Sequence, residues 1–436
     1  MASKANRRIV ITTFGSFGDI HPYIPIALEL KSRGHRPVIA SLPFYKEKFE
    51  ALGIEFHPIR PDMGSPADNL DMLERAMDRK TGTEYIFKEL LMPSLRDSYE
   101  DILEVSRGAD LLITHPITLA GPIVANVLKI PWVSTVLAPT SFLSIYDPPA
   151  TPAGKLFDSI IRLNPMIAKV LFGLVKLKLK SWIKPLYALR EEVGLALGKH
   201  PIFEGQHSPE MVLALFSKVM ADPQRDWPPN TVVTGFPFFD RRDDQGVPRE
   251  LAEFLEQGPP PIVFTLGSSA VWTAGDFYHE SLKAAVRLGT RAVLLRGEQD
   301  LDLPPLPPEV ASFDYVPYSE IFPRAKAVVH QGGVGTTAQV LRAGVPMLVV
   351  PFSHDQPDNA ARMVRLGVGR QIQRSDYNSK SAERELKRLL YEKRFSQRAS
   401  EVSQIVKGEN GAVTACDSIE RIMFGTVQDL PELAAK

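Results

Sequence analysis

The sequence has almost no cysteine and no excess of charge of either sign. Its 436 residues include a single cysteine, Cys416, so no disulfide can form within the chain and a reducing, intracellular compartment is expected. Lys and Arg together number 51, as do Asp and Glu, so the basic excess that nucleic-acid binding requires is missing. These absences exclude disulfide-stapled secreted domains and strongly basic nucleic-acid-binding proteins.

The sequence also lacks an uninterrupted apolar stretch long enough to cross a membrane. The most apolar long stretch, 160–179, is interrupted by Arg162, Lys169, Lys176 and Lys178. The first residues lead into an apolar strand without the features of a signal peptide. We therefore expect a cytoplasmic protein with no transmembrane segment, which leaves peripheral membrane contact open.

Short apolar runs typical of strands alternate with amphipathic runs typical of helices, which indicates a parallel α/β fold. Because 436 residues exceed what one hydrophobic core usually serves, two domains are expected. We place them at 1–217 and 247–436, joined by a linker at 218–246 that is rich in Pro, Asp and Arg, with the last helix packing back on the first domain. The expected strands are 8–13, 36–41, 111–114, 133–137 and 211–216 in the first half, and 262–266, 291–295, 327–330 and 346–351 in the second.

One apolar helix in the first half has two interpretations. Its apolar residues repeat at helical spacing and are Leu163, Met166, Ile167, Val170, Leu171 and Leu174. A helix packed on the core with its lysines in solvent is the prediction we favour, and such a helix can also form one wall of an apolar acceptor pocket. The alternative is a basic amphipathic surface that rests on lipid.

The segment 330–337, His-Gln-Gly-Gly-Val-Gly-Thr-Thr, predicts an anion site. It follows the strand at 327–329 and opens a helix at 338–342, where free backbone N–H groups and the helix dipole attract phosphate. It is not a P-loop, because the G-K-[ST] ending is missing. The first loop, at 15–18, lacks the G-x-G-x-x-G spacing, and the strand at 36–41 is not followed by an acidic residue, so an NAD enzyme is not expected.

Three motifs carry a resemblance to a known family. Residues 330–337, Ala-Gly-Val-Pro at 343–346 and Asp355-Gln356 resemble the donor-site signature of inverting GT-B glycosyltransferases of the UDP-glycosyltransferase superfamily (family 1). Gly-Ser-Phe-Gly-Asp at 15–19 is similar to their first loop. The most similar subgroup contains bacterial natural-product glycosyltransferases and sterol glucosyltransferases. The resemblance implies an α/β fold of two Rossmann-like domains facing across a cleft.

The same resemblance implies an activity and a donor site. A sugar would move from a nucleotide sugar, of the UDP-glucose or dTDP-rhamnose type, to a hydroxyl of a small apolar acceptor such as a phenolic or flavonoid, polyketide, terpenoid or sterol. The nucleotide sugar is a co-substrate, and no cofactor is implied. The implied donor-site residues are His330, Gly332, Gly333, Gly335, Thr336 and Thr337 for the diphosphate, Asp355 and Gln356 for the sugar hydroxyls, Ser268 near the phosphates or the acceptor, and Tyr315 and Val316 beside the nucleobase.

Two departures from the family pattern concern the nucleoside. Tyr315 stands where relatives often have Trp, and Ala338-Gln339 replaces the ribose-binding glutamate of plant relatives. The choice between UDP and dTDP therefore stays open.

Inverting transfer needs a base for the acceptor hydroxyl, and Asp19 takes the family's position for it. Without the family pattern, Asp19 would be interpreted as a cap of the first helix, because Asp is favoured at such ends. His115 and His21 are the other candidates, and the resemblance suggests an Asp19–His115 dyad.

The sequence also offers a metal motif and two competing functions. Asp300-Leu301-Asp302 matches the metal-binding D-x-D motif of a different glycosyltransferase fold. It lies in a proline-rich stretch after a strand, which indicates an exposed loop, so no metal is expected. A catalytically silent homologue acting as a partner protein and a nucleotide-sugar epimerase are the competing functions. The intact motifs argue against the first, and the apolar region 141–185 argues against the second.

Overall fold

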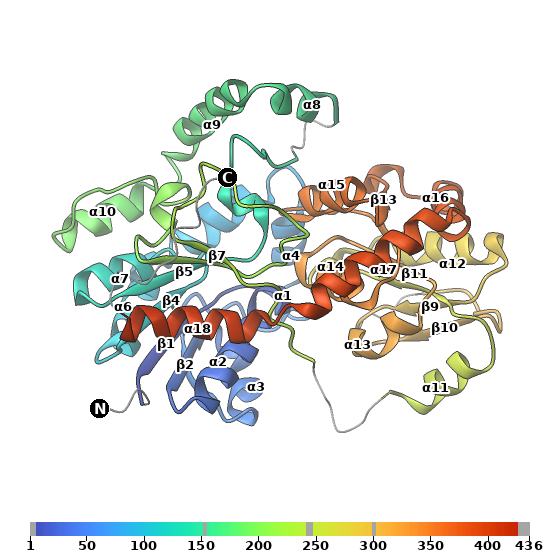
Figure 1. Cartoon of the computed structure of the whole chain (residues 1–436), viewed down its shortest axis with the longest axis horizontal. Coiled ribbons are helices and arrows are strands. Elements are labelled where there is room, and N and C mark those ends of the chain that lie inside the picture. The colour runs from blue at the N-terminus through green and yellow to red at the C-terminus, as the bar shows by residue number, and fades with distance from the viewer. Residues whose placement is uncertain (1–5, 151–154, 241–246, 299–301, 426–436) are drawn as a thin grey trace.

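The computed structural model describes residues 6–150, 155–240, 247–298 and 302–425 of the chain. Figure 1 shows two α/β halves side by side, the N-terminal half in blue to green and the C-terminal half in yellow to red. One parallel sheet of 7 strands and another of 6 strands form their centres. The expected two-domain α/β fold is confirmed.

The first sheet reverses its strand order at β1 and β4. Its order is β3-β2-β1-β4-β5-β6-β7, so the chain moves outward from β1 in one direction and from β4 in the other. The strands are β1 (Arg8–Thr12), β2 (Arg36–Ser41), β3 (Glu55–Pro58), β4 (Leu111–Thr114), β5 (Trp132–Val136), β6 (Met211–Ala214) and β7 (Thr231–Val233). Ligands bind in the crevice beyond the carboxyl ends of strands at such a reversal, here the loops after β1 and β4.

The second sheet reverses at β8 and β11. Its order is β10-β9-β8-β11-β12-β13, which places the loops after β8 and β11 at the reversal. The strands are β8 (Ile262–Thr265), β9 (Ala292–Leu295), β10 (Val310–Phe313), β11 (Ala327–His330), β12 (Met347–Val349) and β13 (Gly369–Gln371). The central strands are buried along their whole length, as expected for a parallel sheet covered on both faces.

Helices cover the faces of both sheets (Figure 1). Those of the first half are α1 (Phe17–Ile20), α2 (Tyr23–Ser32), α3 (Lys46–Ala51), α4 (Leu70–Met77), α5 (Gly82–Tyr85), α6 (Leu95–Ser106), α7 (Gly121–Leu128), α8 (Lys155–Leu163), α9 (Pro165–Leu179) and α10 (Lys184–Glu192). Those of the second half are α11 (Arg249–Glu256), α12 (Phe277–Leu288), α13 (Tyr318–Ile321), α14 (Val334–Ala343), α15 (Gln356–Leu366), α16 (Ser379–Tyr391), α17 (Lys393–Gly408) and α18 (Gly411–Phe424).

The chain returns to the first half at its C-terminal end. Figure 1 shows α17 and α18 running from the second half across to the first. Helix α18 lies against α2, and Arg33 of the α2 C-terminus forms ion pairs with Asp417 and Glu420. Cys416 of α18 is fully buried in the core of the first half. The two halves are thus joined by apolar packing as well as by the chain.

The region predicted as the linker, 218–246, contains part of the first sheet. Strand β7 lies within it and pairs in parallel with β6, from Val212 opposite Thr231 to Ala214 opposite Val233. Residues 241–246 of this linker lie outside the described residues. The short strand was missed because three residues carry no readable periodicity.

Helices α8 and α9 contradict the favoured prediction for the apolar helix. Asn164 caps α9 and Pro165 occupies its first turn, so two helices form instead of one. In α9, Ala168 is the buried residue, whereas Met166, Val170 and Leu174 are exposed. The apolar stripe therefore faces away from the core. Within the described part of the chain, no helix is both long and apolar enough to span a membrane.

Candidate active site between the two sheets

The loop after β1 holds Asp19 in place through a helix cap. Ser16 is the N-cap of α1, and its backbone N–H and its hydroxyl both donate to Asp19 Oδ2, at 2.8 and 3.1 Å. Gly15 has a φ of +124°, and a Cβ on it would lie 2.4 Å from Asp19 Oδ2. Asp19 therefore takes part in capping α1, as its interpretation as a helix cap predicts. One carboxylate oxygen remains for another role.

The other carboxylate oxygen of Asp19 faces His115, at the end of β4. His115 Nε2 lies 3.4 Å from Asp19 Oδ1, within ion-pair distance but outside hydrogen-bond geometry. His115 Nδ1 accepts a hydrogen bond from the N–H of Ile117, so the ring proton belongs on Nε2, toward Asp19. The structure thus brings together the two residues of the expected dyad. In this tautomer His115 presents an N–H group to the Asp19 carboxylate.

The surroundings of Asp19 keep its carboxylate ionised. Burial acts to raise the pKa of Asp19, but the interaction with the nearby His115 ring and the two donors of Ser16 outweigh burial and hold the pKa below its usual value. An ionised carboxylate can accept a proton at neutral pH. The geometry therefore suits a base that His115 orients.

His21 lies in a different cluster of side chains. Its Nε2 is 2.9 Å from Lys48 Nζ, and its ring packs against Phe17 and Phe239. Lys48 also lies over the ring of Phe17, 4.5 Å from the centroid. These neighbours differ from those of Asp19, so the dyad of this loop is formed with His115.

The loop after β11 is shaped by glycines at the start of α14. Gly332 has a φ of +92°, and a Cβ on it would lie 2.7 Å from Val349 Cγ1 and 3.2 Å from the Gln356 carbonyl oxygen. Gly333 is the N-cap of α14 and provides no side-chain cap. Beside Gly335 there is open space, because a Cβ on it would meet no atom within 4 Å. The first N–H groups of α14 thus meet an open end, which suits an anion.

Helix α14 begins earlier than the sequence predicted. It starts at Val334 instead of Ala338, so Gly335, Thr336 and Thr337 belong to its first turn. The Thr337 hydroxyl is buried with no hydrogen-bond partner, as is the Gln331 side-chain oxygen next to the loop. The sequence predicted a later start because glycine and β-branched threonine have low helix propensity.

The His330 side chain is engaged inside the protein. Its Nδ1 accepts the N–H of Gly332 at 3.1 Å, and its Nε2 lies 3.4 Å from the sulfur of Met347. Burial lowers the pKa of His330 to about 3, so the ring is neutral at physiological pH. His330 therefore holds the loop in shape here, and direct contact of its ring with a diphosphate stays a prediction.

Asp355 and Gln356 start α15, close to the same loop. Burial raises the pKa of Asp355 to about 7; a hydrogen bond from Asn359 lowers it, and the charge of Asp19 raises it further. The Gln356 side-chain oxygen accepts the N–H groups of Phe352 and Ser353, at 2.8 and 3.2 Å. Gln356 thus shapes its own loop, and Asp355 is the member of the pair whose pKa responds to the charge of Asp19.

Asn359 is a site residue that the sequence analysis missed. Its side-chain nitrogen donates to the Gly332 carbonyl at 2.9 Å and to Asp355 Oδ2 at 2.7 Å, so it links the loop after β11 to α15. Its side-chain oxygen is buried without a partner. The signal was present, because Asn359 stands four residues after Asp355 and shares its side of the helix.

The sites of the two halves face each other. Burial raises the pKa of Asp355 and lowers that of His354, both from the second half; the negative charge of Asp19 adds to the first shift and opposes the second. Val334, at the start of α14, packs against the cores of both halves, and α1 contacts α14. The loop that carries Asp19 in the first half therefore lies beside the start of α14 in the second half.

The remaining predicted donor residues surround the loop after β8. Ser268 lies half-buried in the turn that follows β8, Val316 is fully buried, and Tyr315 is 50% exposed. Tyr318 connects this region to the rest of the site, because its hydroxyl is 2.9 Å from Thr265 Oγ1. Val316 belongs to the core, and contact of Tyr315 with a nucleobase stays a prediction.

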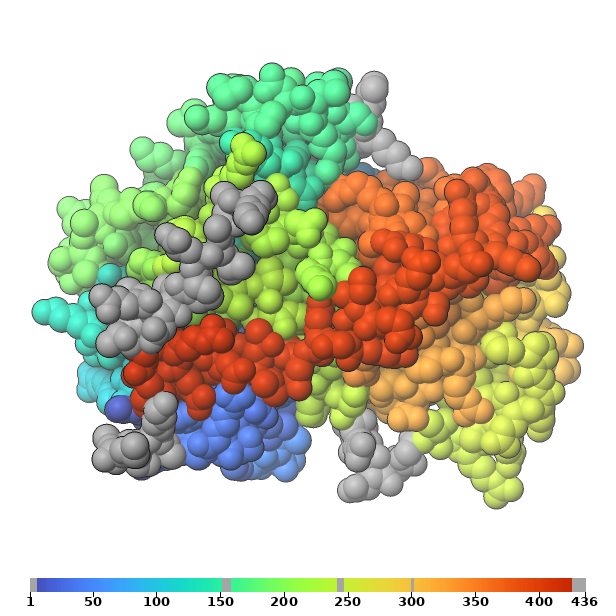
Figure 2. All heavy atoms as spheres, viewed as in Figure 1, coloured from blue at the N-terminus to red at the C-terminus, as the bar shows by residue number. Residues whose placement is uncertain are grey.

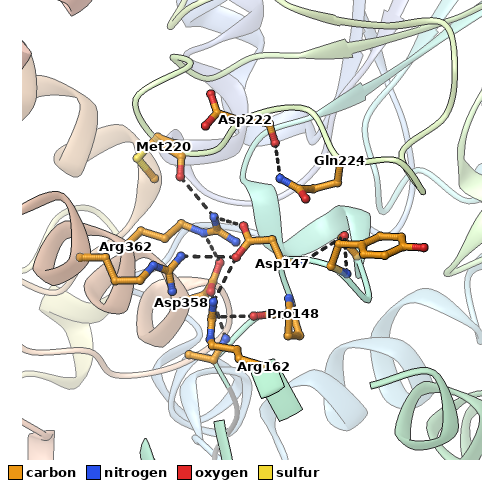
Figure 3. A network of polar contacts seen from close by, with 12 residues as sticks. Asp147, Pro148, Arg162, Met220, Asp222, Gln224, Asp358 and Arg362 are labelled. Carbon is orange, nitrogen blue, oxygen red and sulfur yellow. Dashed lines mark hydrogen bonds and ion pairs between the residues drawn. The ribbon is translucent and has the colours of Figure 1, made fainter. Parts of the chain in front are cut away.

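A buried ionic network joins α15 to the first half. Figure 3 shows Asp147, from the segment after β5, between the guanidinium groups of Arg162 and Arg362. Arg362 also binds Asp358 at 2.7 Å and donates to the Met220 carbonyl at 3.2 Å. Because Asp358 and Arg362 follow Asp355 on α15, this network helps to set the position of the donor-side helix against the first half.

Comparison with known proteins shows which proteins the chain resembles. Residues 279–412 match the family described as erythromycin biosynthesis protein CIII-like, C-terminal domain. O-mycaminosyltylonolide 6-deoxyallosyltransferase of Streptomyces fradiae is 29% identical over 95% of this chain and 97% of its own. Sterol 3-beta-glucosyltransferase of Neurospora crassa is 28% identical over 95% of this chain, which spans 27% of that protein.

A solved structure supports the same fold. The glycosyltransferase VinC in complex with dTDP superposes with a TM-score of 0.69 at 19% identity, covering 95% of this chain and 99% of its own. The chain is thus a GT-B-fold homologue of antibiotic glycosyltransferases and sterol glucosyltransferases, with an erythromycin biosynthesis protein CIII-like C-terminal domain.

Proposed function

We propose that this protein is an inverting, metal-independent glycosyltransferase that moves a sugar from a nucleoside diphosphate sugar to a hydroxyl of a small apolar acceptor. The observation that carries the proposal is the meeting of Asp19 and His115 from the first half with Asp355 and the open start of α14 from the second. Each half supplies one part of the chemistry. The similar proteins are named as a 6-deoxyallosyltransferase and a sterol 3-beta-glucosyltransferase, both of which transfer sugars.

The reaction follows from these groups. Asp19 takes the proton of the acceptor hydroxyl as its oxygen forms a bond with the anomeric carbon of the sugar. The bond between that carbon and the diphosphate breaks on the opposite side, which inverts the configuration. The N–H groups at the start of α14 stabilise the departing negative charge. His115 positions Asp19 and stabilises its ionised form.

No metal is required for this scheme. The helix end supplies the charge stabilisation that a divalent cation supplies in other transferases. Among the residues that the structure describes, no group of three or more His, Cys, Asp or Glu side chains could hold a metal. Asp300 and Leu301 of the D-x-D motif lie outside the described residues. We expect EDTA to leave turnover unchanged, and restoration of lost turnover by added Mg²⁺ or Mn²⁺ would contradict the proposal.

The acceptor side is apolar. Phe14 after β1 and Ile117 after β4 line a cavity of about 20 Å³ beside the dyad's loops, and most of its other lining residues are apolar too, with Arg60, Ser98 and Thr118 as the polar ones. That volume holds little more than one water molecule, so an acceptor enters only if these side chains move apart. Polyketides, terpenoids, sterols and phenolics all fit an apolar wall with one base.

The nucleotide is tested first, because this test needs no knowledge of the acceptor. We expect calorimetric titration to show binding of dTDP or UDP, the nucleotides of the dTDP-rhamnose and UDP-glucose type donors. Gly335→Ala should weaken that binding by about tenfold or more, because the added methyl group lies over the free N–H groups and disturbs a charge-assisted hydrogen bond. The matched control is Gly408→Ala, at the end of α17, where a Cβ also meets no atom within 4 Å. Failure of both nucleotides to bind would refute the proposed donor site.

A further inference from the structure

The outer face of helix α9 is apolar where solvent would ordinarily select polar residues. It consists of Leu163 at the end of α8 and of Met166, Ile167, Val170, Leu174 and Leu177 of α9, which we call the α9 outer face. Leu163 is 81% exposed, Leu177 71% and Val170 62%. In Figure 2 the helix forms part of the ridge at the top of the first half. Exposed apolar residues gathered on one ridge indicate an interaction surface.

The arrangement around α9 is the reverse of an ordinary surface helix. With 3.6 residues per turn, Met166, Val170, Leu174 and Leu177 fall along one side, and Ala168, which is fully buried, falls on the other. An ordinary surface helix turns its apolar stripe to the core. Here the stripe points outward, and small or half-buried residues make the inner contact.

Positive charge accompanies this face. Between residues 159 and 190 the sequence contains seven Lys and Arg and no Asp or Glu. On the helix, Lys169 and Lys180 fall along one edge of the α9 outer face and Lys178 along the other, and all three are exposed. These three lysines therefore border the α9 outer face with positive charge.

The helix pair is held in place by contacts on its inner side. Arg162 of α8 pairs with Asp147 at 3.1 Å, within the network of Figure 3. Lys176 of α9 pairs with Glu204 and lies 4.7 Å from the centroid of the Phe203 ring. These contacts fix the direction in which the outer face points. The exposed stripe is therefore a feature of the folded protein.

We propose that the α9 outer face docks this protein on an anionic lipid surface. An amphipathic helix with an apolar arc and flanking lysines lies flat in a membrane interface, where its apolar residues enter the acyl boundary and its lysines meet anionic headgroups. A protein partner fits less well, because lysine is depleted from protein interfaces, whereas here lysines border both edges of the arc. The docking is peripheral and does not depend on the proposed transfer reaction.

Vesicle binding by the full chain tests the apolar contribution. Purified protein is mixed with vesicles of equal parts phosphatidylcholine and phosphatidylglycerol, and flotation measures the bound fraction. We expect binding, with a partition coefficient at least about tenfold lower for the triple variant Met166→Ser, Val170→Ser and Leu174→Ser, which loses three apolar side chains from the interface. The melting temperature should stay unchanged, because these side chains are already exposed.

A matched variant separates this face from exposed apolar residues in general. Val286→Ser, Val364→Ser and Tyr391→Ser remove three exposed apolar side chains from the second half. This control variant should bind vesicles like the unchanged protein. An equal loss of vesicle binding in the two triple variants would overturn the proposal.

Charge is tested in the same assay. Lys169→Gln, Lys178→Gln and Lys180→Gln should each reduce binding by about fivefold on anionic vesicles, and binding should fall with rising salt. Failure of the unchanged protein to float with these vesicles would refute membrane docking. Elution of the unchanged protein as a dimer, with the outer-face variant monomeric and no vesicle binding by either, would assign the face to a second copy of the chain instead.

Discussion

Gly332 in the loop after β11 and Gly335 in the first turn of α14 provide a sharp test of the proposed donor site. Gly332 has a φ of +92° and no room for a Cβ, which would lie 2.7 Å from Val349 Cγ1. In Gly332→Ala, left-handed backbone strain costs about 1–2 kcal/mol and overpacking costs about 1–3 kcal/mol, so that the free energy of unfolding should fall by about 2–5 kcal/mol. Gly335 is different, because it is helical and open space lies beside it.

The matched variant Gly335→Ala should have the opposite effect on stability. Alanine in a helix is favoured over glycine by up to about 1 kcal/mol, so the melting temperature should stay or rise slightly. For a domain of this size, the loss in Gly332→Ala corresponds to a drop of about 4–20 °C in the melting temperature of the second half. Differential scanning calorimetry measures both variants. The reasoning is refuted if the two variants shift the melting temperature alike.

The Gly335 variant also separates function from folding. If the open end of α14 receives a diphosphate, Gly335→Ala binds nucleotide more weakly while folding at least as well as the unchanged protein. Native affinity in a stable Gly335→Ala would place the diphosphate elsewhere, even with the fold of the loop confirmed.

Three further predictions concern the carboxylates of the site and its supports. Asp19→Asn should lower kcat by about 100-fold or more and leave nucleotide affinity nearly unchanged, because it removes a general base from the acceptor side; near-native turnover would exclude Asp19 as the base. Asp355 has a folded pKa of about 7, above its ordinary value, so its protonated form favours the folded state, and its contribution to stability is present below the unfolded pKa and is lost as pH rises through 7. The melting temperature of the unchanged protein should therefore fall between pH 5 and pH 8 relative to Asp355→Asn, and parallel curves would contradict this pKa. Asp358→Asn should cost about 3 kcal/mol in urea unfolding, because it takes a partner from the buried Arg362, whereas Glu253→Gln in an exposed ion pair should cost less than about 1 kcal/mol; equal losses would show that the network of Figure 3 contributes no special stability.

Much of the fold was readable because parallel strands leave a strong local signal. The strands expected at 36–41, 111–114 and 327–330 match β2, β4 and β11 residue for residue. Each is a short apolar run buried on both faces, bounded by polar or glycine residues. Strands β3, β7, β10 and β13 and the start of α14 at Val334 were missed. Strands of three or four residues are too short to show a period, and a helix start rich in Gly and Thr resembles a loop.

The site was readable in part through the family resemblance, which suggested the pairing of Asp19 with His115. Strands β1 and β4 are neighbours in the sheet, and the loops that follow them bring these two residues together. Gln356 and His330 could not be placed in this way. Their side chains turn inward to hold backbone N–H groups of their own loops, and such choices depend on the exact path of the backbone.

The α/β class, the order of the two halves and the motifs of the proposed donor site could be predicted from the sequence alone, because they follow from local periodicity and short-range spacing. Which helix faces are buried depends on the tertiary structure. A helical period in 163–174 shows that an apolar stripe exists, but only the packing of Ala168 and the network around Asp147 show that the stripe faces solvent. Burial depends on neighbours that are distant in the sequence, and the sequence pattern of a single helix does not contain them.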